Sequence, residues 1–170
     1  ALQDRSDLAG LIFISAKPNI FIAGADLREF ASSISTITED QTFVMCQRGQ
    51  KLFGRLSKMP FPTVAAIDGT CVGGGAELAI WCDRRIMTTN PRTDFGFPEV
   101  KLGIFPGWGG TARAPRMIGL GNAVEMITGG DAIDAKSAWS MGLCSDVVEG
   151  EQLLSAAISM VRDEQTTKQY

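Results

Sequence analysis

The stretch that decides the fold is TVAAIDGTCVGGGAELAIW, residues 63–81. Its first five residues form a short apolar run, which is typical of a strand buried on both faces. Asp68 and Gly69 predict a turn, and the glycines at 73–75 lead into a helix-like stretch at 76–81. A strand that passes through a glycine-rich turn into a helix is a common unit of α/β proteins.

Similar units lie on both sides of this stretch. Apolar runs predict further strands at 11–15, 85–88, 93–96 and 144–148, and residues 20–23 continue the apolar pattern up to Gly24. Helices are expected at about 38–59, 111–118, 122–128, 135–141 and 151–163. The alternation of strands and helices predicts an α/β fold with parallel strands, and 170 residues suit one domain spanning residues 1–170.

The composition removes several kinds of chemistry. The chain contains no histidine, so Ser-His-Asp and Cys-His catalysis and histidine-ligated metal sites are excluded within it. Its four cysteines form no C-x-x-C pair, which indicates reduced, buried thiols and therefore a cytoplasmic or matrix-like compartment. The net charge of -3 with scattered Lys and Arg argues against a nucleic-acid partner. No apolar run is long enough for a membrane span.

Two glutamates in apolar surroundings are the candidate acid/base pair. Glu77 stands between the glycines and the run LAIW, and Glu99 lies in FGFPEV, just before the glycine-rich loop 103–110. Burial raises a carboxyl pKa toward values useful near neutral pH, and carboxylates must do this work in a chain without histidine. The alternatives are a helix-terminal charge for Glu77 and a surface position for Glu99.

The glycines at 73–75 admit more than one interpretation. A phosphate-binding P-loop is disfavoured because Ala76-Glu77 stands where Gly-Lys-Ser/Thr is needed. A Rossmann fingerprint after Gly119 fails because Val124 replaces its third glycine. A tight, closely packed turn and a site where backbone N–H groups meet a ligand both remain open.

Three blocks of motifs follow one another along the chain: FIAGADL at 21–27; PTVAAIDG at 62–69 with GGGAELA at 73–79; and FGFPEV at 95–100 with PGWGGT at 106–111. In this order they resemble the motifs of the crotonase (enoyl-CoA hydratase/isomerase) family over nearly the whole chain. The resemblance implies an α/β crotonase-like spiral of ββα units.

The resemblance also implies roles for individual residues. Glu77 and Glu99 would hold the catalytic water, and the backbone N–H groups of Ala25 and Gly74 would form an oxyanion hole for the acyl-CoA thioester. The implied substrate-binding residues are Ala23, Gly24, Asp26, Leu27, Gly73, Pro98, Gly107 and Trp108. Neither a metal nor a separate cofactor is expected, since CoA is part of the substrate.

The implied activity is that of an enoyl-CoA hydratase, which adds water to trans-2-enoyl-CoA to give 3-hydroxyacyl-CoA in fatty-acid β-oxidation. Three alternatives remain: Δ3,Δ2-enoyl-CoA isomerisation or another crotonase-family acyl-CoA reaction; a non-catalytic crotonase-fold protein that binds RNA or a protein; and an unrelated phosphate or dinucleotide binder. Which glutamate is acid and which is base also stays open.

The resemblance finally implies an incomplete domain. A complete family member has further strands before residue 1 and helices after about residue 165, so this chain alone is expected to aggregate or to show low activity. The extended protein is expected to be a homotrimer or hexamer. The Pro-Gly-Trp-Gly-Gly loop and the interval from Glu77 to Glu99 are similar to the hydratase half of the multifunctional fatty-acid-oxidation α-subunit, which implies a fused or associated 3-hydroxyacyl-CoA dehydrogenase.

Overall fold

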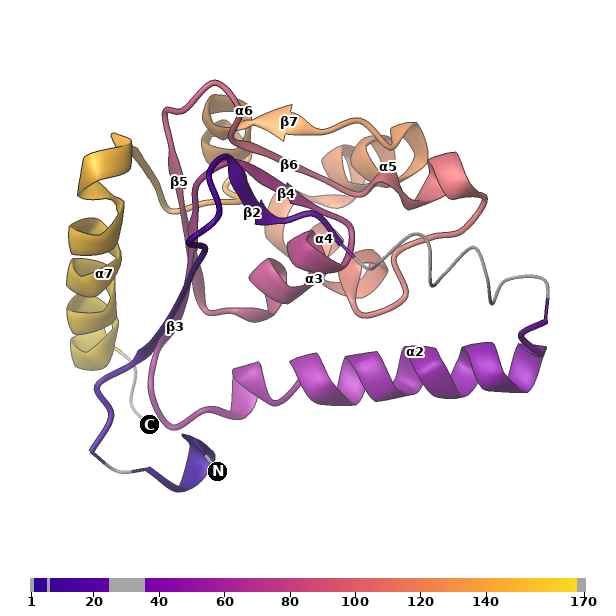
Figure 1. Cartoon of the computed structure of the whole chain (residues 1–170), viewed down its shortest axis with the longest axis horizontal. Helices are drawn as coiled ribbons and strands as arrows, with labels where there is room; N and C mark the ends of the chain where they lie inside the picture. The colour runs from indigo at the N-terminus through magenta and orange to yellow at the C-terminus, as the bar shows by residue number, and fades with distance from the viewer. Residues whose placement is uncertain (1, 6, 25–35, 168–170) are drawn as a thin grey trace.

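Two four-stranded sheets and the helices around them make up the fold (Figure 1). The computed structural model describes residues 2–5, 7–24 and 36–167. The strands are β1 (Leu11–Ile14), β2 (Ile20–Ile22), β3 (Thr63–Ile67), β4 (Thr70–Val72), β5 (Arg84–Thr88), β6 (Asp94–Gly96), β7 (Ile133–Asp134) and β8 (Asp146–Val148). The α-helices are α2 (Glu39–Phe53), α3 (Gly74–Trp81), α4 (Gly110–Ile118), α5 (Leu120–Gly129), α6 (Ala135–Ser140) and α7 (Leu153–Thr167). Short 3-10 helices are η1 (Leu2–Asp4), η2 (Leu56–Lys58), η3 (Pro98–Leu102) and η4 (Gly150–Gln152). None of the helices in the described ranges is both long and apolar enough to cross a membrane.

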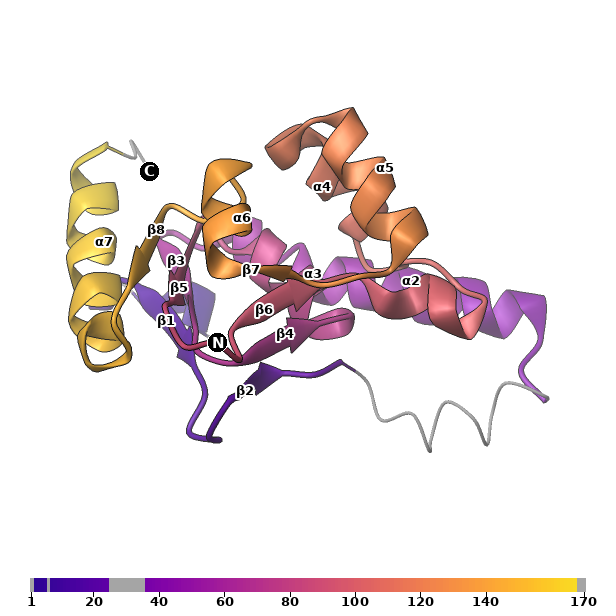
Figure 2. The ribbon, with the colours of Figure 1, turned by 90° about the horizontal axis from the view of Figure 1, so that it is seen from above.

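The first six strands alternate between the two sheets. Sheet A has the order β1-β3-β5-β8, and sheet B has the order β2-β4-β6-β7. All neighbours in sheet A are parallel, as are β2, β4 and β6 in sheet B, whereas β7 runs antiparallel to β6. The predicted α/β fold with parallel strands is therefore confirmed. Each of the first three ββ units adds one strand to each sheet before the chain enters a helical segment, which is the expected spiral of ββα units (Figure 2).

β3 is buried over its whole length because packing covers both faces of sheet A. Val64 and Ala66 pack against α7, which stands alone beside this sheet in Figure 1. Ala65 and Ile67 point the opposite way, into the main core that sheet A shares with sheet B and α3. Successive residues of a strand point to opposite faces, so an unbroken apolar run suits this central position.

The helix expected at about 38–59 ends earlier, at Phe53. Thr38 caps its N-terminus in a capping box with Gln41, and Gly54 terminates it by donating its N–H to Gln50 O and Leu52 O. The single turn η2 then replaces the last predicted helical residues. None of the fifteen residues of α2 is buried, so this helix contributes one wall to a cavity rather than a face to the core.

The helix expected at 76–81 begins two residues sooner, so that Gly74 and Gly75 are its first residues. Gly75 is buried against Ile22 of β2, where an added Cβ would overlap the Ile22 backbone and side chain. The glycine run therefore serves close packing as well as a helix N-terminus.

Candidate active site

Three neighbouring strands of sheet B end at the same edge. β2, β4 and β6 are parallel, and their carboxyl ends lead directly into residues 23–24, 73–74 and 97–99. The N–H of Gly73 donates to Gly96 O over 3.0 Å, which ties the ends of β4 and β6 together. Ligands of parallel sheets commonly bind outside the carboxyl ends of the strands. The topology thus places the candidate residues around one point.

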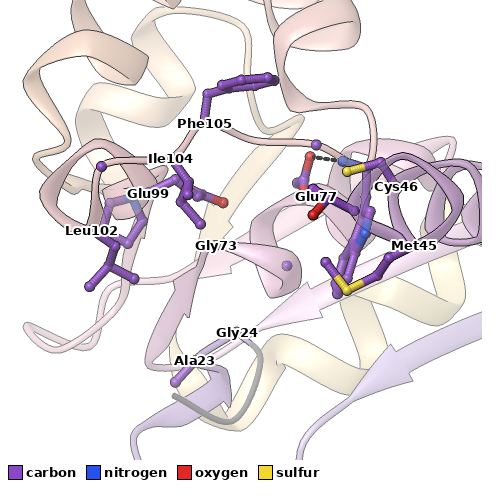
Figure 3. A pocket seen from close by; sticks show the side chains of 16 residues that line it. Ala23, Gly24, Met45, Cys46, Gly73, Glu77, Glu99, Leu102, Ile104 and Phe105 are labelled. Atoms are coloured by element: carbon purple, nitrogen blue, oxygen red, sulfur yellow. Dashed lines mark hydrogen bonds between the residues drawn. The ribbon is translucent and has the colours of Figure 1, made fainter. Parts of the chain in front are cut away.

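A cavity of about 330 Å³ lies at this edge (Figure 3). Nine of the residues predicted from the sequence line it: Ala23, Gly24, Gly73, Gly74, Glu77, Pro98, Glu99, Gly107 and Trp108. Ala25, Asp26 and Leu27, the other predicted residues, lie outside the described residues. Glu77 and Glu99, 22 positions apart in the sequence, therefore face the same cavity.

Seven further lining residues were not predicted: Thr42, Met45, Cys46, Leu102, Gly103, Ile104 and Phe105. The first three come from α2, where their i, i+3, i+4 spacing puts them on one helix face. Leu102 ends η3, and the other three lie between η3 and the Pro-Gly-Trp-Gly-Gly loop. The helical spacing on α2 was readable from the sequence, but what that face contacts was not.

Glu77 is held by the backbone of a distant loop. Its side chain is 2% exposed and lies in the first turn of α3. Its Oε1 accepts the N–H of Trp108 over 2.7 Å and the N–H of Gly110 over 2.9 Å. These two donors thus come from the loop that follows Glu99, rather than from the adjacent glycines as a helix-terminal charge would use.

Burial dominates the proton affinity of Glu77. Desolvation raises its pKa from 4.5 to about 7, and the negative charge of Glu99 acts in the same direction. The backbone N–H groups of Gly110, Trp108 and Gly109 oppose this rise because they favour the ionised form. A carboxyl that titrates near neutral pH can either accept or supply a proton there.

Glu99 is buried as well, at 9% exposure, in the 3-10 helix η3. Burial raises its pKa, and its Oε2 has no hydrogen-bond partner among the described residues. The other oxygen, Oε1, lies 3.6 Å from the position that a Cβ on Gly73 would take. The surface position that proline neighbours favour for a lone glutamate is therefore not found here. Because the two carboxyls influence each other, they titrate as a coupled pair.

Backbone N–H groups gather beside the glutamates. Gly74 is the first residue of α3, so its N–H has no acceptor within the helix. Gly24, with φ +97°, lies against Gly73 and Gly74: a Cβ built on it would be 3.7 Å from the Gly74 nitrogen. The first of the two oxyanion-hole positions predicted from the sequence, Gly74, thus lines the cavity, next to the segment that leads into Ala25.

The indole ring of Trp108 wedges between two helices. A Cβ on Gly74 would lie 2.8 Å from Cζ3 of this ring, and a Cβ on Gly49 of α2 would overlap its other side. Phe53 contacts it edge to face, with ring centroids 5.6 Å apart. The indole ring of Trp108 therefore leaves no room for a side chain at position 74. Close packing is thus a second reason for glycine at this position, beside the close approach of a ligand that the sequence predicts.

The chemistry of the site rests on carboxyls and amides. Within the described part of the chain, no three His, Cys, Asp or Glu side chains are grouped closely enough to hold a metal ion. Two buried carboxyls of raised pKa, an N–H without an intrahelical acceptor and an apolar cavity suit proton transfer to and from a reacting group whose oxygen gains negative charge.

The chain matches a known protein family and several solved structures. The sequence profile of the enoyl-CoA hydratase/isomerase family matches residues 2–168. Among similar solved structures, DspI from Pseudomonas aeruginosa is 31% identical with a TM-score of 0.85, and the match covers 95% of this chain and 64% of that one. An enoyl-CoA hydratase from Bacillus anthracis is 34% identical with a TM-score of 0.84, covering 95% and 60%. Human mitochondrial Δ3-Δ2-enoyl-CoA isomerase is 29% identical with a TM-score of 0.84, covering 96% and 62%.

The chain spans 60 to 64% of the length of these three proteins. The family profile nevertheless extends over residues 2–168 of this chain. The fold of the chain is similar to that of a solved hydratase and to that of a solved isomerase. The chain belongs to the enoyl-CoA hydratase/isomerase family, also called the crotonase family.

Proposed function

We propose that the protein hydrates trans-2-enoyl-CoA to 3-hydroxyacyl-CoA, the hydration step of fatty-acid β-oxidation. The observation that carries the proposal is the presence of two buried carboxyls, Glu77 and Glu99, on one apolar cavity beside the N–H of Gly74. CoA enters as part of the substrate, and the proposed reaction uses neither a metal nor a separate cofactor.

The two glutamates divide the proton transfers. As the water oxygen bonds to C3 of the enoyl group, Glu77 accepts a proton from that water. Two N–H donors at Oε1 favour its ionised form and support this assignment. Glu99 supplies a proton to C2, and its buried Oε2, without a partner among the described residues, supports this second role. Burial raises the pKa of both carboxyls, and the two titrate as a coupled pair.

Backbone amides stabilise the charge that develops on the thioester oxygen. Addition of water at C3 moves an electron pair toward this oxygen, which the N–H groups of Gly74 and Ala25 are proposed to bind. Each such donor is worth about 3 to 4 kcal/mol in comparable oxyanion holes. The helix N-terminus at Gly74 adds the favourable end of the α3 dipole.

The acyl chain is proposed to lie along the apolar part of the cavity. This part is lined by Met45 of α2, by Leu102 at the end of η3, and by Ile104 and Phe105 just after η3. These side chains have no hydrogen-bonding groups beyond a thioether, so they suit a hydrocarbon chain rather than a sugar or a phosphate.

Turnover of purified protein with trans-2-enoyl-CoA in ¹⁸O-labelled water tests the proposal. Hydration puts solvent oxygen at C3 of the product and removes the conjugated absorbance of the substrate. Unchanged substrate with both 2-enoyl-CoA and 3-enoyl-CoA would refute it and favour a binding protein.

Isomerisation of 3-enoyl-CoA is the second candidate, because the human mitochondrial isomerase matches this chain as well as the bacterial hydratase does. It needs one carboxyl to move a proton from C2 to C4. In the same assay, conversion of 3-enoyl-CoA to 2-enoyl-CoA without uptake of ¹⁸O identifies isomerisation.

The proposal extends to assembly as a trimer or hexamer. Large apolar side chains are exposed on α2, where Phe43 is 62% exposed, and around the cavity mouth and α5, where Phe105 and Leu120 are 70% and 69% exposed. Exposed apolar surface of this kind supports a subunit contact. Sedimentation of the protein tests it, and a single monomeric species at micromolar concentration would contradict it.

A further inference from the structure

Trp81 contacts the loop at residues 107–110 but does not line the cavity. It ends α3, and its indole Nε1 donates to the carbonyl oxygen of Trp108 over 2.7 Å. The loop lies directly on the indole, since a Cβ on Gly109 would be 2.6 Å from Nε1. The guanidinium of Arg113 lies 4.2 Å from the ring centroid and donates to Ile80 O, so the ring is held by contacts on more than one side.

Gln50 of α2 binds the preceding carbonyl of the same loop. Its Nε2 donates to Gly107 O over 2.8 Å. The carbonyls of residues 107 and 108 thus each accept one side-chain hydrogen bond, from two different helices. Neither Gln50 nor Trp81 lines the cavity, so we expect any effect of these residues on turnover to pass through the loop backbone.

The geometry of the peptide bond makes these contacts relevant to Glu77. The carbonyl of Gly107 and the N–H of Trp108 belong to one planar trans peptide group and point in opposite directions. Gln50 therefore binds one end of this group, and its other end donates to Glu77 Oε1 over 2.7 Å. Likewise, the carbonyl of Trp108 shares a peptide group with the N–H of Gly109, which also favours the ionised form of Glu77.

We propose that Gln50 and Trp81 are positioning residues for Glu77: each fixes one of two consecutive peptide groups whose N–H ends face its carboxylate. Each series of hydrogen bonds runs from a side-chain N–H through one peptide group to the Glu77 carboxyl. A hydrogen bond to the carbonyl end both orients the peptide group and polarises its N–H toward the acceptor. The consequence for turnover rests on the proposed function, whereas the consequence for the proton affinity of Glu77 does not.

Loss of either donor weakens an interaction that favours the ionised carboxylate, so the pKa of Glu77 rises. We expect Gln50→Met and Trp81→Phe each to increase the proton affinity of Glu77 about tenfold, which moves its pKa from about 7 to about 8. The matched controls are Gln47→Met, one turn earlier on α2, and Trp139→Phe, which replaces a 57% exposed indole on α6. Within the described part of the chain, neither control side chain lines the cavity or hydrogen-bonds to the 107–110 loop, and both variants should leave the titration unchanged.

The direct measurement is a ¹³C NMR titration of the Glu77 carboxyl in ligand-free, glutamate-labelled protein, with its resonance assigned by loss in Glu77→Gln. The same spectra report whether each variant is folded. Because Gln50 is exposed, Gln50→Met keeps the test valid even if Trp81→Phe unfolds. A folded Gln50→Met variant whose Glu77 titrates as in the wild type would overturn the inference.

The kinetic measurement is the pH profile of kcat with trans-2-enoyl-CoA. We expect the acidic limb to move up by about one pH unit, the loss at pH 7 to be recovered above about pH 9, and KM to change less than about twofold. A shifted titration with an unshifted kcat profile supports the positioning of Glu77 and refutes its proposed role in turnover. A uniform loss of kcat at all pH values with an unshifted titration shows a merely structural role and overturns the inference.

Discussion

Replacing Glu77 by glutamine should stabilise the protein at alkaline pH. The carboxyl is 2% exposed, and burial raises its pKa from 4.5 to about 7. The difference is about 2.5 pH units, and one unit corresponds to about 1.36 kcal/mol, so ionised Glu77 costs the folded state about 3 kcal/mol. Glutamine keeps an oxygen that can accept the two loop N–H groups, yet it carries no charge to desolvate.

The sign of the pH dependence follows from proton binding. Between pH 4.5 and about 7 the folded state holds the Glu77 proton and the unfolded state has lost it, so the free energy of unfolding of the wild type falls as the pH rises through this range. The glutamine variant has no such dependence at this position. Its advantage is therefore fully developed at pH 8, where it reaches about 3 kcal/mol, and it disappears near pH 4.5.

Urea unfolding of both proteins at a series of pH values, followed by circular dichroism with a common slope, measures this difference. Glu125→Gln, which neutralises an exposed glutamate on α5, is the matched control and should leave the midpoint nearly unchanged at every pH. Equal midpoints for the wild type and Glu77→Gln at pH 8 would show that the buried carboxyl ionises without cost, and the desolvation argument would be wrong.

Three further outcomes are expected. Glu99→Gln should lower hydration of 2-enoyl-CoA at least ~100-fold with little change in KM, and near-wild-type kcat would remove Glu99 from the acid/base pair. Gly74→Ala should reduce turnover because its methyl would lie 2.8 Å from the indole wedge, whereas Gly129→Ala, with nothing within 4 Å, should be mild; equal losses in a steady-state assay would contradict this. Arg85→Met should cost about 2 to 4 kcal/mol in urea unfolding, since the buried guanidinium donates to three carbonyls, and Arg84→Met, at a half-exposed ion pair, should cost less than about 1 kcal/mol.

Much of the fold could be predicted because its strands are short, apolar and punctuated by glycine or proline. The run at 63–67 forms a central strand, and all five of its residues are buried because both faces of the sheet are covered there. An unbroken apolar run suits such a position. Two of the boundaries that were wrong lie at glycines. Gly54 ends α2 and Gly74 begins α3, and in both cases tertiary contacts decide whether the glycine belongs to the helix.

The site could be predicted only in part. Apolar neighbours correctly indicated the burial of Glu77 and Glu99. The hydrogen bonds that hold Glu77 come from a loop more than thirty residues further along, and a one-dimensional pattern does not encode which loop folds back. The contact of Trp81 with this loop was missed for the same reason, since an aromatic residue at a helix end is more often simply core.

The alternation of strands between two sheets also has a thermodynamic consequence. In each sheet, the strands of one ββ unit pair only with those of the unit before it and the unit after it. The free energy of opening a unit therefore depends mainly on its contacts with these neighbouring units, as in repeat proteins. Among the described strands, β1 and β2 each pair with one other strand, whereas β3 and β4 pair with two. Amide hydrogens of β1 and β2 should therefore exchange through local openings in which β3 and β4 stay folded. Protection from exchange should be greatest in β3, so the strands next to α3 and Glu77 should stay folded when β1 and β2 open.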